Sequence, residues 1–195
     1  MKKQYFFIAI FLTLQFSAFK SSAQVYEKGN FVIDGFYGFP NLLSAILKSA
    51  AKTAFDVPKV TTVGPLGLTA EYLIGEKFGI GLEATYSTTR IKAEEAGYSY
   101  EYQFNRLRIL PRVNFHFGSN DKLDPYLTVG AGYGSFKTEF KSNDASAPDL
   151  SFTVPGSLAT RVGFGLRYFF TDHIGFMAEG GIGGPLVRLG LSAKF

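Results

Sequence analysis

The chain has 195 residues, enough for one domain with a packed core, and its lack of cysteine excludes a disulfide framework and a thiolate metal site. Its formal net charge of +4 falls to +1 without Lys2, Lys3 and Lys20, which all lie in a first segment free of acidic residues. The high pI is therefore no argument for binding to nucleic acid, which we do not expect as a partner.

Residues 1–23 have the features of a secretory signal peptide. Lys2 and Lys3 precede an apolar run from Tyr5 to Leu14, and Ser21-Ser22-Ala23 forms a small-residue cleavage pattern. The apolar run is too short to cross a bilayer as a helix. We therefore predict an exported chain that is cleaved after Ala23 and has a mature part of residues 24–195.

The mature part alternates with period two, which is typical of β-strands with two different faces. The predicted strands are roughly 30–39, 63–74, 78–87, a fourth that follows the connection 88–99 and runs to 117, and then 127–134, 160–168, 174–179 and 186–195. The third is the clearest, with Phe78, Ile80 and Leu82 opposite glycines and Glu83. No stretch has 18 consecutive apolar residues, so the mature chain can enter a membrane only as a closed barrel.

The predicted connections alternate in length. Those at 75–77, 118–124 and 171–173 are short, whereas those at 40–62, 88–99 and 137–155 are long. This layout is typical of bacterial outer-membrane barrels and predicts an all-β fold, an eight-stranded antiparallel up-and-down transmembrane β-barrel. One irregularity is that the apolar face changes parity near Asn105, which indicates either a β-bulge or strands that continue above the membrane.

Three features indicate that the apolar face points outward to lipid, in contrast to a soluble lipocalin-like barrel. The polar face is rich in glycine, as the narrow interior of an eight-stranded barrel requires. The chain stops on Phe195 at the end of an alternating strand. Aromatic residues gather at the short-turn ends of the strands, as in an interfacial girdle: Phe31, Tyr72, Phe78, Phe117, Tyr168, Phe170 and Phe176.

The sequence resembles the small outer-membrane barrels of the OmpX/OmpA type, within the broad outer membrane protein beta-barrel domain family of Gram-negative bacteria. The run from Pro125 to Gly134 (PYLTVGAGYG) and the terminal Gly190 to Phe195 (GLSAKF) carry this resemblance. It implies location in the outer membrane, and it implies that Leu191, Ala193 and Phe195 form an assembly signal for the barrel-assembly machinery. A fold of this kind does not by itself specify an activity.

Seven charged residues face the predicted lumen at about the same height, namely Asp34, Glu71, Glu83, Arg112, Arg167, Glu179 and Arg188. Because buried charges must be paired, this set predicts a salt-bridged plug and not an open pore. Arg108 and Arg161 sit higher, without an obvious acid on a strand at their level. They form a candidate anion site in the upper lumen.

The first long connection holds a helical pattern between Asn41 and Phe55, with apolar positions at helical spacing. We predict a short amphipathic helix there. Its candidate lid or membrane contacts are Leu42, Leu43, Ile46, Leu47, Lys48 and Lys52. The helix either covers the barrel mouth, lies in the outer leaflet, or packs on the other loops.

Catalysis is not expected. The chain has two histidines, His116 and His173, both at the short-turn end and without the spacing of metal ligands. We expect no cofactor, no metal and no enzyme activity.

The predicted role is structural or a surface interaction through the extracellular loops, with outer-membrane lipid and lipopolysaccharide as partners of a monomer. One alternative is the passage of small hydrophobic solutes, as the resemblance to OmpW-like barrels implies, with Tyr100, Tyr102, Phe104 and Leu110 as the apolar lining. Another is an accessory barrel of a secretion system, as PorT-like barrels of the same broad family imply. An apolar lining above a plug favours transport, whereas charges throughout favour a structural role.

Overall fold

The computed structural model describes residues 27–54, 59–95, 97–117, 122–143 and 148–195, except for the side chains of 42–44, 54, 95 and 155. The predicted signal peptide and its cleavage site lie outside the described residues.

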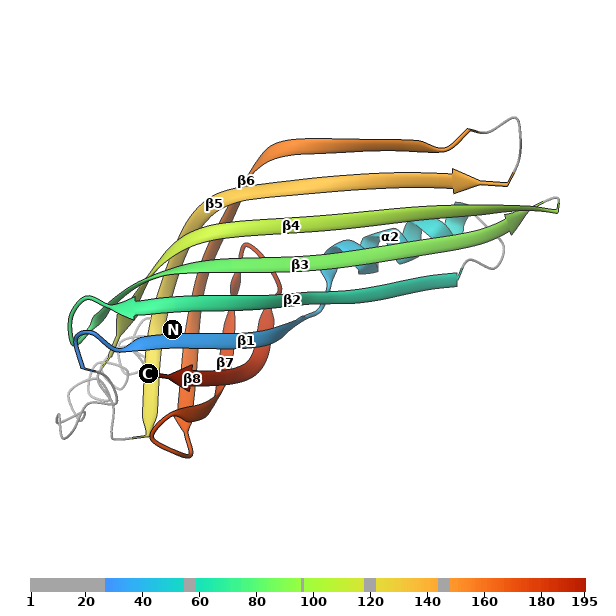
Figure 1. Ribbon diagram of the computed structural model, residues 1–195. Coiled ribbons are helices and arrows are strands. Elements are labelled where there is room, and N and C mark those ends of the chain that lie inside the picture. The colour runs from blue at the N-terminus through green and yellow to red at the C-terminus, as the bar shows by residue number, and fades with distance from the viewer. Residues whose placement is uncertain (1–26, 55–58, 96, 118–121, 144–147) are drawn as a thin grey trace, which may run out of the picture.

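The eight predicted strands form one closed antiparallel barrel in which each strand pairs with its neighbours in the sequence and β1 pairs with β8 (Figure 1). The elements are β1 (Phe31–Phe39), α2 (Leu42–Ala54), β2 (Lys59–Leu73), β3 (Phe78–Glu95), β4 (Tyr98–His116), β5 (Leu123–Ser142), β6 (Leu150–Phe169), β7 (Ile174–Ile182) and β8 (Val187–Lys194). The predicted fold class is confirmed, and so is a short helix between the first two strands.

The seam between β1 and β8 closes the sheet, so that the barrel has no free edge along this line. Phe31 and Phe195 exchange backbone hydrogen bonds of 3.0 and 2.9 Å at one end of the seam. From there the pairing continues to Phe39 and Val187. The last residue of the chain is therefore bonded to the first strand.

The strands differ greatly in length. β1, β7 and β8 have nine, nine and eight residues, whereas β2 to β6 have between 15 and 20. Beyond the closed barrel, β2 to β6 therefore continue as a five-stranded wall, here called the extension (Figure 1). The prediction of long loops at 88–99 and 137–155 is therefore wrong. Most of the described residues in these two ranges belong to the strands β3, β4, β5 and β6.

The two faces of the sheet exchange their polarity where the extension begins. On β3 the outward residues change from Tyr86 to Arg90 and Lys92, while the inward residues change from Glu83 to Ile91. Glu101 on the outer face of β4 binds Arg90 at 2.8 Å and Lys92 at 2.9 Å. Inside the membrane an outward face must be apolar, whereas beyond the membrane it must be soluble in water.

This exchange explains the change of parity near Asn105. The pairing of β3 with β4 is continuous from Phe78 and Phe115 to Glu95 and Tyr98, without a bulge. Of the two explanations left open by the sequence, the structure therefore has strands that continue past the apolar band. Register shifts do occur on β2 between Val63 and Leu66 and between β5 and β6 after Gly134.

α2 packs on the inner face of the extension and contacts β3. Ala51 on the helix and Ile91 and Ala93 on β3 are buried. The side chains of Leu42 and Leu43 lie outside the described part of the chain. Ile46 is 67% exposed, so this member of the predicted apolar face does not pack against the wall, while Leu47 is half-buried and Lys48 and Lys52 are exposed.

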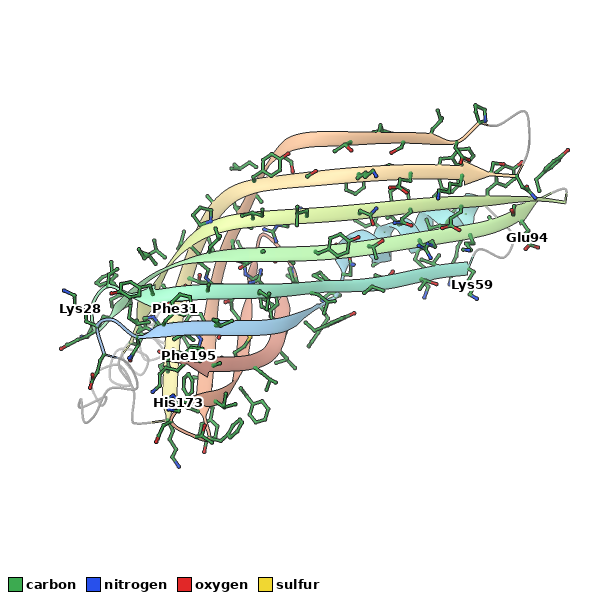
Figure 2. The ribbon with its side chains drawn as sticks, in the orientation of Figure 1. Lys28, Phe31, Lys59, Glu94, His173 and Phe195 are labelled. Atoms are coloured by element: carbon green, nitrogen blue, oxygen red, sulfur yellow. The ribbon has the colours of Figure 1, made fainter. Side chains whose placement is uncertain are left out.

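The outside of the barrel is apolar and uncovered. Leu68 on β2 and Leu191 on β8 are 61% and 56% exposed, and a belt of this size on a protein surface marks contact with lipid or a partner. Along β3, the separation from Phe78 to Tyr86 corresponds to roughly 20 Å along the barrel axis, close to the ~25 Å apolar band of such barrels. Figure 2 places Phe31, Phe195 and His173 at the short-turn end and Lys59 and Glu94 at the far end of the extension. In the described part of the chain, no helix has the length and apolarity needed to cross a membrane.

Candidate functional site

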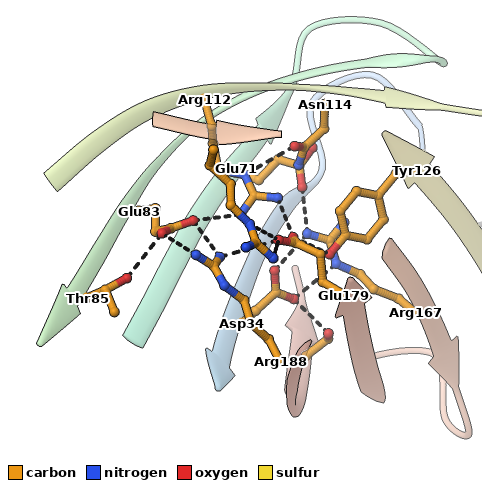
Figure 3. Close-up of polar contacts among 12 residues, drawn as sticks. Asp34, Glu71, Glu83, Thr85, Arg112, Asn114, Tyr126, Arg167, Glu179 and Arg188 are labelled. Carbon is orange, nitrogen blue, oxygen red and sulfur yellow. Dashed lines mark hydrogen bonds and ion pairs between the residues drawn. The ribbon is translucent and has the colours of Figure 1, made fainter. Parts of the chain in front are cut away.

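The charged residues that alternate with the apolar belt point into the lumen and meet there. All seven residues of the predicted set are buried, and they are joined by ion pairs and hydrogen bonds that cross from one side of the barrel to the other (Figure 3). We call this set, with His116, Asp124, Tyr126 and Arg161, the lumen network. Each member comes from an inward position of a strand, so the network follows directly from the period of two.

Arg167 on β6 lies in the part of the network nearest the short turns. Its guanidinium contacts Asp34 on β1, with Nε–Oδ1 at 3.0 Å and Nη2–Oδ2 at 2.7 Å. It also contacts Glu71 at 2.7 Å and Asp124 at 3.3 Å. One arginine thus joins β6 to β1, β2 and β5, and charge-assisted bonds of this kind are the stronger class of hydrogen bond.

Glu83 on β3 forms a second junction. Its two carboxylate oxygens accept hydrogen bonds from Arg188 on β8 at 2.6 and 2.7 Å, and Arg112 on β4 adds one at 3.2 Å. Arg112 reaches on to Glu179 on β7 at 2.9 Å. The four side chains therefore connect β3, β4, β7 and β8 across the lumen.

His116 and Asp124 belong to the network. His116 is expected from the sequence as an interior or rim residue without a metal, which agrees with its burial, whereas Asp124 is expected in a turn. His116 lies between two carboxylates, with Nδ1 at 2.7 Å from Asp124 and Nε2 at 2.9 Å from Glu71. Because both ring nitrogens face acceptors, the imidazolium form satisfies both contacts. The signal for Asp124 was present in the sequence, since it shares inward parity with Tyr126 and Thr128.

Tyr126 fills the space between the two junctions. Its hydroxyl donates to Glu179 at 3.1 Å, and the Arg167 guanidinium lies 4.5 Å from the centre of its ring. Gly165 on the adjacent strand makes room for this ring, because a Cβ atom there would lie 2.1 Å from it. The glycine-rich inward face thus accommodates large side chains from neighbouring strands.

The two upper arginines, predicted together as one anion site, have different surroundings. Arg161 binds Glu179 with Nε at 2.9 Å and Nη2 at 2.8 Å, so the expectation that it lacks an acidic partner is wrong. The position of Arg161 along its strand does not reveal this contact, because its long side chain reaches an acid on β7. Arg108 makes no ion pair in the described part of the chain, and its Nη2 donates to the carbonyl groups of Thr160 and Gly183.

Apolar layers flank the network. Val32, Leu73 and Phe169 form a fully buried cluster at the short-turn end. Phe36 lies against Arg188, whose guanidinium carbon is 4.5 Å from the ring centre, and Leu110 is fully buried. Buried apolar side chains therefore lie on both sides of the buried ion pairs along the lumen.

The inner face of the extension carries aromatic rings above these layers. The predicted apolar lining residues Tyr100, Tyr102 and Phe104 have inward parity on β4, and they meet rings of β5. Tyr102 lies 4.9 Å from Phe140, and Phe104 lies 6.0 Å from Phe136, measured between ring centres. On β6 the side chains of the same face are left exposed.

The remaining predicted residues are placed as follows. Leu191 on β8 and Phe195 directly after it point outward and are 56% and 67% exposed, and Ala193 between them is half-buried. His173 is an exposed turn residue whose Nδ1 lies 2.9 Å from the carbonyl oxygen of Lys194.

Solved structures with a similar fold are outer-membrane barrels of low sequence identity. Ail of Yersinia pestis, in complex with the heparin analogue sucrose octasulfate, is 16% identical with a TM-score of 0.48, covering 87% of this chain and 100% of that chain. The N-terminal barrel of Pseudomonas aeruginosa OprF is 16% identical with a TM-score of 0.45 at the same coverage. The E. coli outer membrane protein W is 19% identical with a TM-score of 0.46, again at 87% and 100% coverage.

No curated protein matches the chain. A family model does, over residues 9–183, and its description is outer membrane protein beta-barrel domain. This match includes most of the strands whose inward residues build the lumen network. The chain therefore belongs to the outer membrane protein beta-barrel domain family.

Proposed function

We propose that this outer-membrane barrel is closed to ions and acts at the cell surface through its extension. The observation that supports closure is the lumen network, in which ion pairs from Arg167 and Glu83 join strands on opposite sides of the barrel. A path for ions has to separate such pairs, and loss of one partner of a buried ion pair costs about 3–5 kcal/mol. The general layout of these barrels puts the short turns in the periplasm and the extension outside the cell.

Conductance across planar lipid bilayers tests closure. We expect the wild-type barrel to insert without steady openings, and flotation with lipid vesicles verifies that it is in the membrane. Steady, ion-selective openings of the inserted wild-type protein would show that the lumen conducts.

The proposed surface contact is with the phosphate groups of lipopolysaccharide. The outer face of the extension exposes Lys59, Arg90, Lys92, Lys137 and Lys141 beyond the apolar belt. Basic side chains at this height face the headgroup region, where they meet phosphates. Arg90 and Lys92 are partly neutralised by Glu101, and Lys137 pairs with Glu139 at 2.6 Å, which leaves Lys59 on β2 and Lys141 on β5 as the first residues to test.

Titration of the folded protein with purified lipopolysaccharide, followed by mobility on native gels, tests this contact. Lys59→Glu with Lys141→Glu is expected to weaken binding. The matched control is Lys77→Glu, which changes the same kind of exposed residue at the short-turn end. Equal binding by the two variants contradicts a contact through the extension.

A second candidate is the passage of small hydrophobic solutes, and the apolar inner face of the extension favours it. Phe152 and Val154 on β6 are 57% and 49% exposed on that face, next to the rings of β5. An apolar lining above the buried ion pairs is the feature that favours transport of solutes over a purely structural role. Quenching of tyrosine fluorescence by a hydrophobic probe, with and without Phe152→Asp, tests it. Thr153→Asp on the outer face is the control, and identical responses of the two variants exclude this role for the inner face.

A further inference from the structure

The buried charges of the described residues balance, with one exception. The buried carboxylates are Asp34, Glu71, Glu83, Asp124 and Glu179, and the cations that contact them are Arg112, Arg161, Arg167, Arg188 and protonated His116. Arg108 remains. It is 3% exposed and has no carboxylate partner among the described residues.

Arg108 has unused hydrogen-bond donors as well as an unbalanced charge. Its Nη2 is held by the carbonyl groups of Thr160 and Gly183, whereas Nε and Nη1 are buried without an acceptor in the described part of the chain. Like charges on Arg106, Arg161 and Arg188 act on Arg108. Glu83 opposes them, but both of its oxygens bind Arg188 and one also binds Arg112. A buried cation in this state is costly unless an anion joins it.

A cavity of about 390 Å³ lies next to Arg108, at the end of the lumen where the extension begins. Its polar lining consists of Asn41, Thr85, Ser87, Arg106 and Arg108, and the turn at Gly184 forms part of its wall. The lining thus combines two guanidinium groups with hydroxyl and amide donors and has no acidic residue. Arg106 makes no ion pair among the described residues and is exposed toward this space.

We propose that this cavity binds a small oxyanion of the phosphate type, held by Arg108 and Arg106 with a hydroxyl donor from Ser87. The Thr85 hydroxyl lines the cavity but already donates to Glu83 at 3.1 Å. An oxyanion supplies the acceptors that Nε and Nη1 lack and neutralises the excess charge, and guanidinium groups are well suited to phosphate. The occupant is either a free phosphate-bearing solute or a phosphate of lipopolysaccharide, because both present the same group. The site does not depend on what the outer face of the extension contacts.

NMR observation of the arginine Nε–H groups, in lipid nanodiscs without lipopolysaccharide, tests the proposal. Titration with inorganic phosphate is expected to shift the Arg108 signal in a saturable way, whereas equal ionic strength of chloride does not. Arg106→Gln is expected to weaken the phosphate affinity at least tenfold, and Lys77→Gln, at the short-turn end, to leave it unchanged. If the Arg108 signal responds to phosphate and chloride alike, the response reflects ionic strength or unselective anion binding, and the proposal is wrong.

Two further arms keep the test informative. Gly184→Ala leaves every charge in place but puts a Cβ atom 2.5 Å from Nη1 of Arg108, so it is expected to displace the guanidinium and weaken binding several-fold. Gly75→Ala, which meets nothing within 4 Å, is its control.

In nanodiscs that contain lipopolysaccharide, an Arg108 signal already at its bound position identifies the lipid phosphate as occupant, and an unchanged phosphate titration identifies a free solute. If Arg108 responds in neither kind of nanodisc, the proposal is overturned.

Discussion

Arg167 on β6 and Asp34 on β1 face each other across the lumen and make two parallel hydrogen bonds, of 3.0 Å from Nε to Oδ1 and 2.7 Å from Nη2 to Oδ2. Neither strand is a neighbour of the other in the barrel. The pair therefore joins parts of the wall that backbone hydrogen bonds do not connect. Ser192 on β8 adds a hydrogen bond to the same Asp34 at 2.7 Å, which fixes the carboxylate beside the seam.

Arg167→Met tests how much this junction contributes to the free energy of unfolding. The change leaves Asp34, Glu71 and Asp124 buried without their shared cation, so we expect a loss of about 3–5 kcal/mol in the free energy of unfolding. Arg108→Met is the matched control, because it removes an arginine that has no acidic partner among the described residues. Urea unfolding in lipid vesicles, followed by circular dichroism, measures both. Equal losses would mean that the ion pairs of Arg167 contribute little.

Gly165→Ala tests whether the glycines of the inward face are required by packing. A Cβ atom at Gly165 would lie 2.1 Å from the Tyr126 ring, which is fixed by Glu179 and Arg167. We expect a loss of about 1–3 kcal/mol in the same unfolding assay, as is usual for overpacking in a filled core. Gly75→Ala, with nothing within 4 Å, is expected to have little effect. A stable Gly165→Ala protein would indicate that the Tyr126 ring moves freely.

The sequence predicted the membrane-spanning part of the fold well, because lipid outside and a narrow lumen inside impose one alternation on every strand. It indicated the extension only as one of two explanations of the parity change near Asn105, and it predicted loops at 88–99 and 137–155. There the outer face is in water and the inner face packs on α2, so the pattern from Thr88 to Glu94 reverses its polarity and resembles a loop. The sequence predicted Arg112, Arg167 and Arg188 and all the network acids except Asp124, but it placed Arg161 in a separate upper site. Asp124 was assigned to a turn, and the contact of Arg161 with Glu179 depends on barrel shear and side-chain reach.

Ile91→Asp tests the packing of α2 on the extension. Ile91 is 5% exposed on the inner face of β3, so an aspartate there has to be buried without a partner or the helix has to leave. We expect faster cleavage of the folded protein by trypsin at Lys48 and Lys52, which lie on the exposed side of α2. Thr153→Asp, on the outer face of β6, is expected to leave the cleavage rate unchanged. Equal rates for wild type and Ile91→Asp would contradict the packing.

Glu101 lies on the outer face of the extension, beyond the membrane-spanning part, and makes the stability of the folded state depend on pH. The hydrogen bond from Lys92, with the charges of Lys92 and Arg90, holds the pKa of the Glu101 carboxyl below its usual value. A depressed pKa stabilises the folded state above the usual glutamate pKa, and this contribution disappears as pH falls through the lower, folded value. We expect Glu101→Gln to cost about 0.5 kcal/mol or less at neutral pH and nothing in strong acid. A difference that grows on acidification would contradict the sign of this effect.

Phe195→Ala separates assembly from stability at the end of the chain. The backbone of Phe195 makes the hydrogen bonds to Phe31 that close the seam, and alanine retains both of them. Its side chain is 67% exposed, so little packing inside the protein is lost. We therefore expect the purified variant to refold into vesicles as the wild type does, while the amount of folded barrel in cells decreases, because the resemblance implies that this ring is an assembly signal. Heat-dependent gel mobility of outer-membrane fractions and of refolded protein measures the two quantities. A variant that fails equally in both assays would show that the ring is needed for the fold itself, and one that is normal in both would show that assembly does not depend on it.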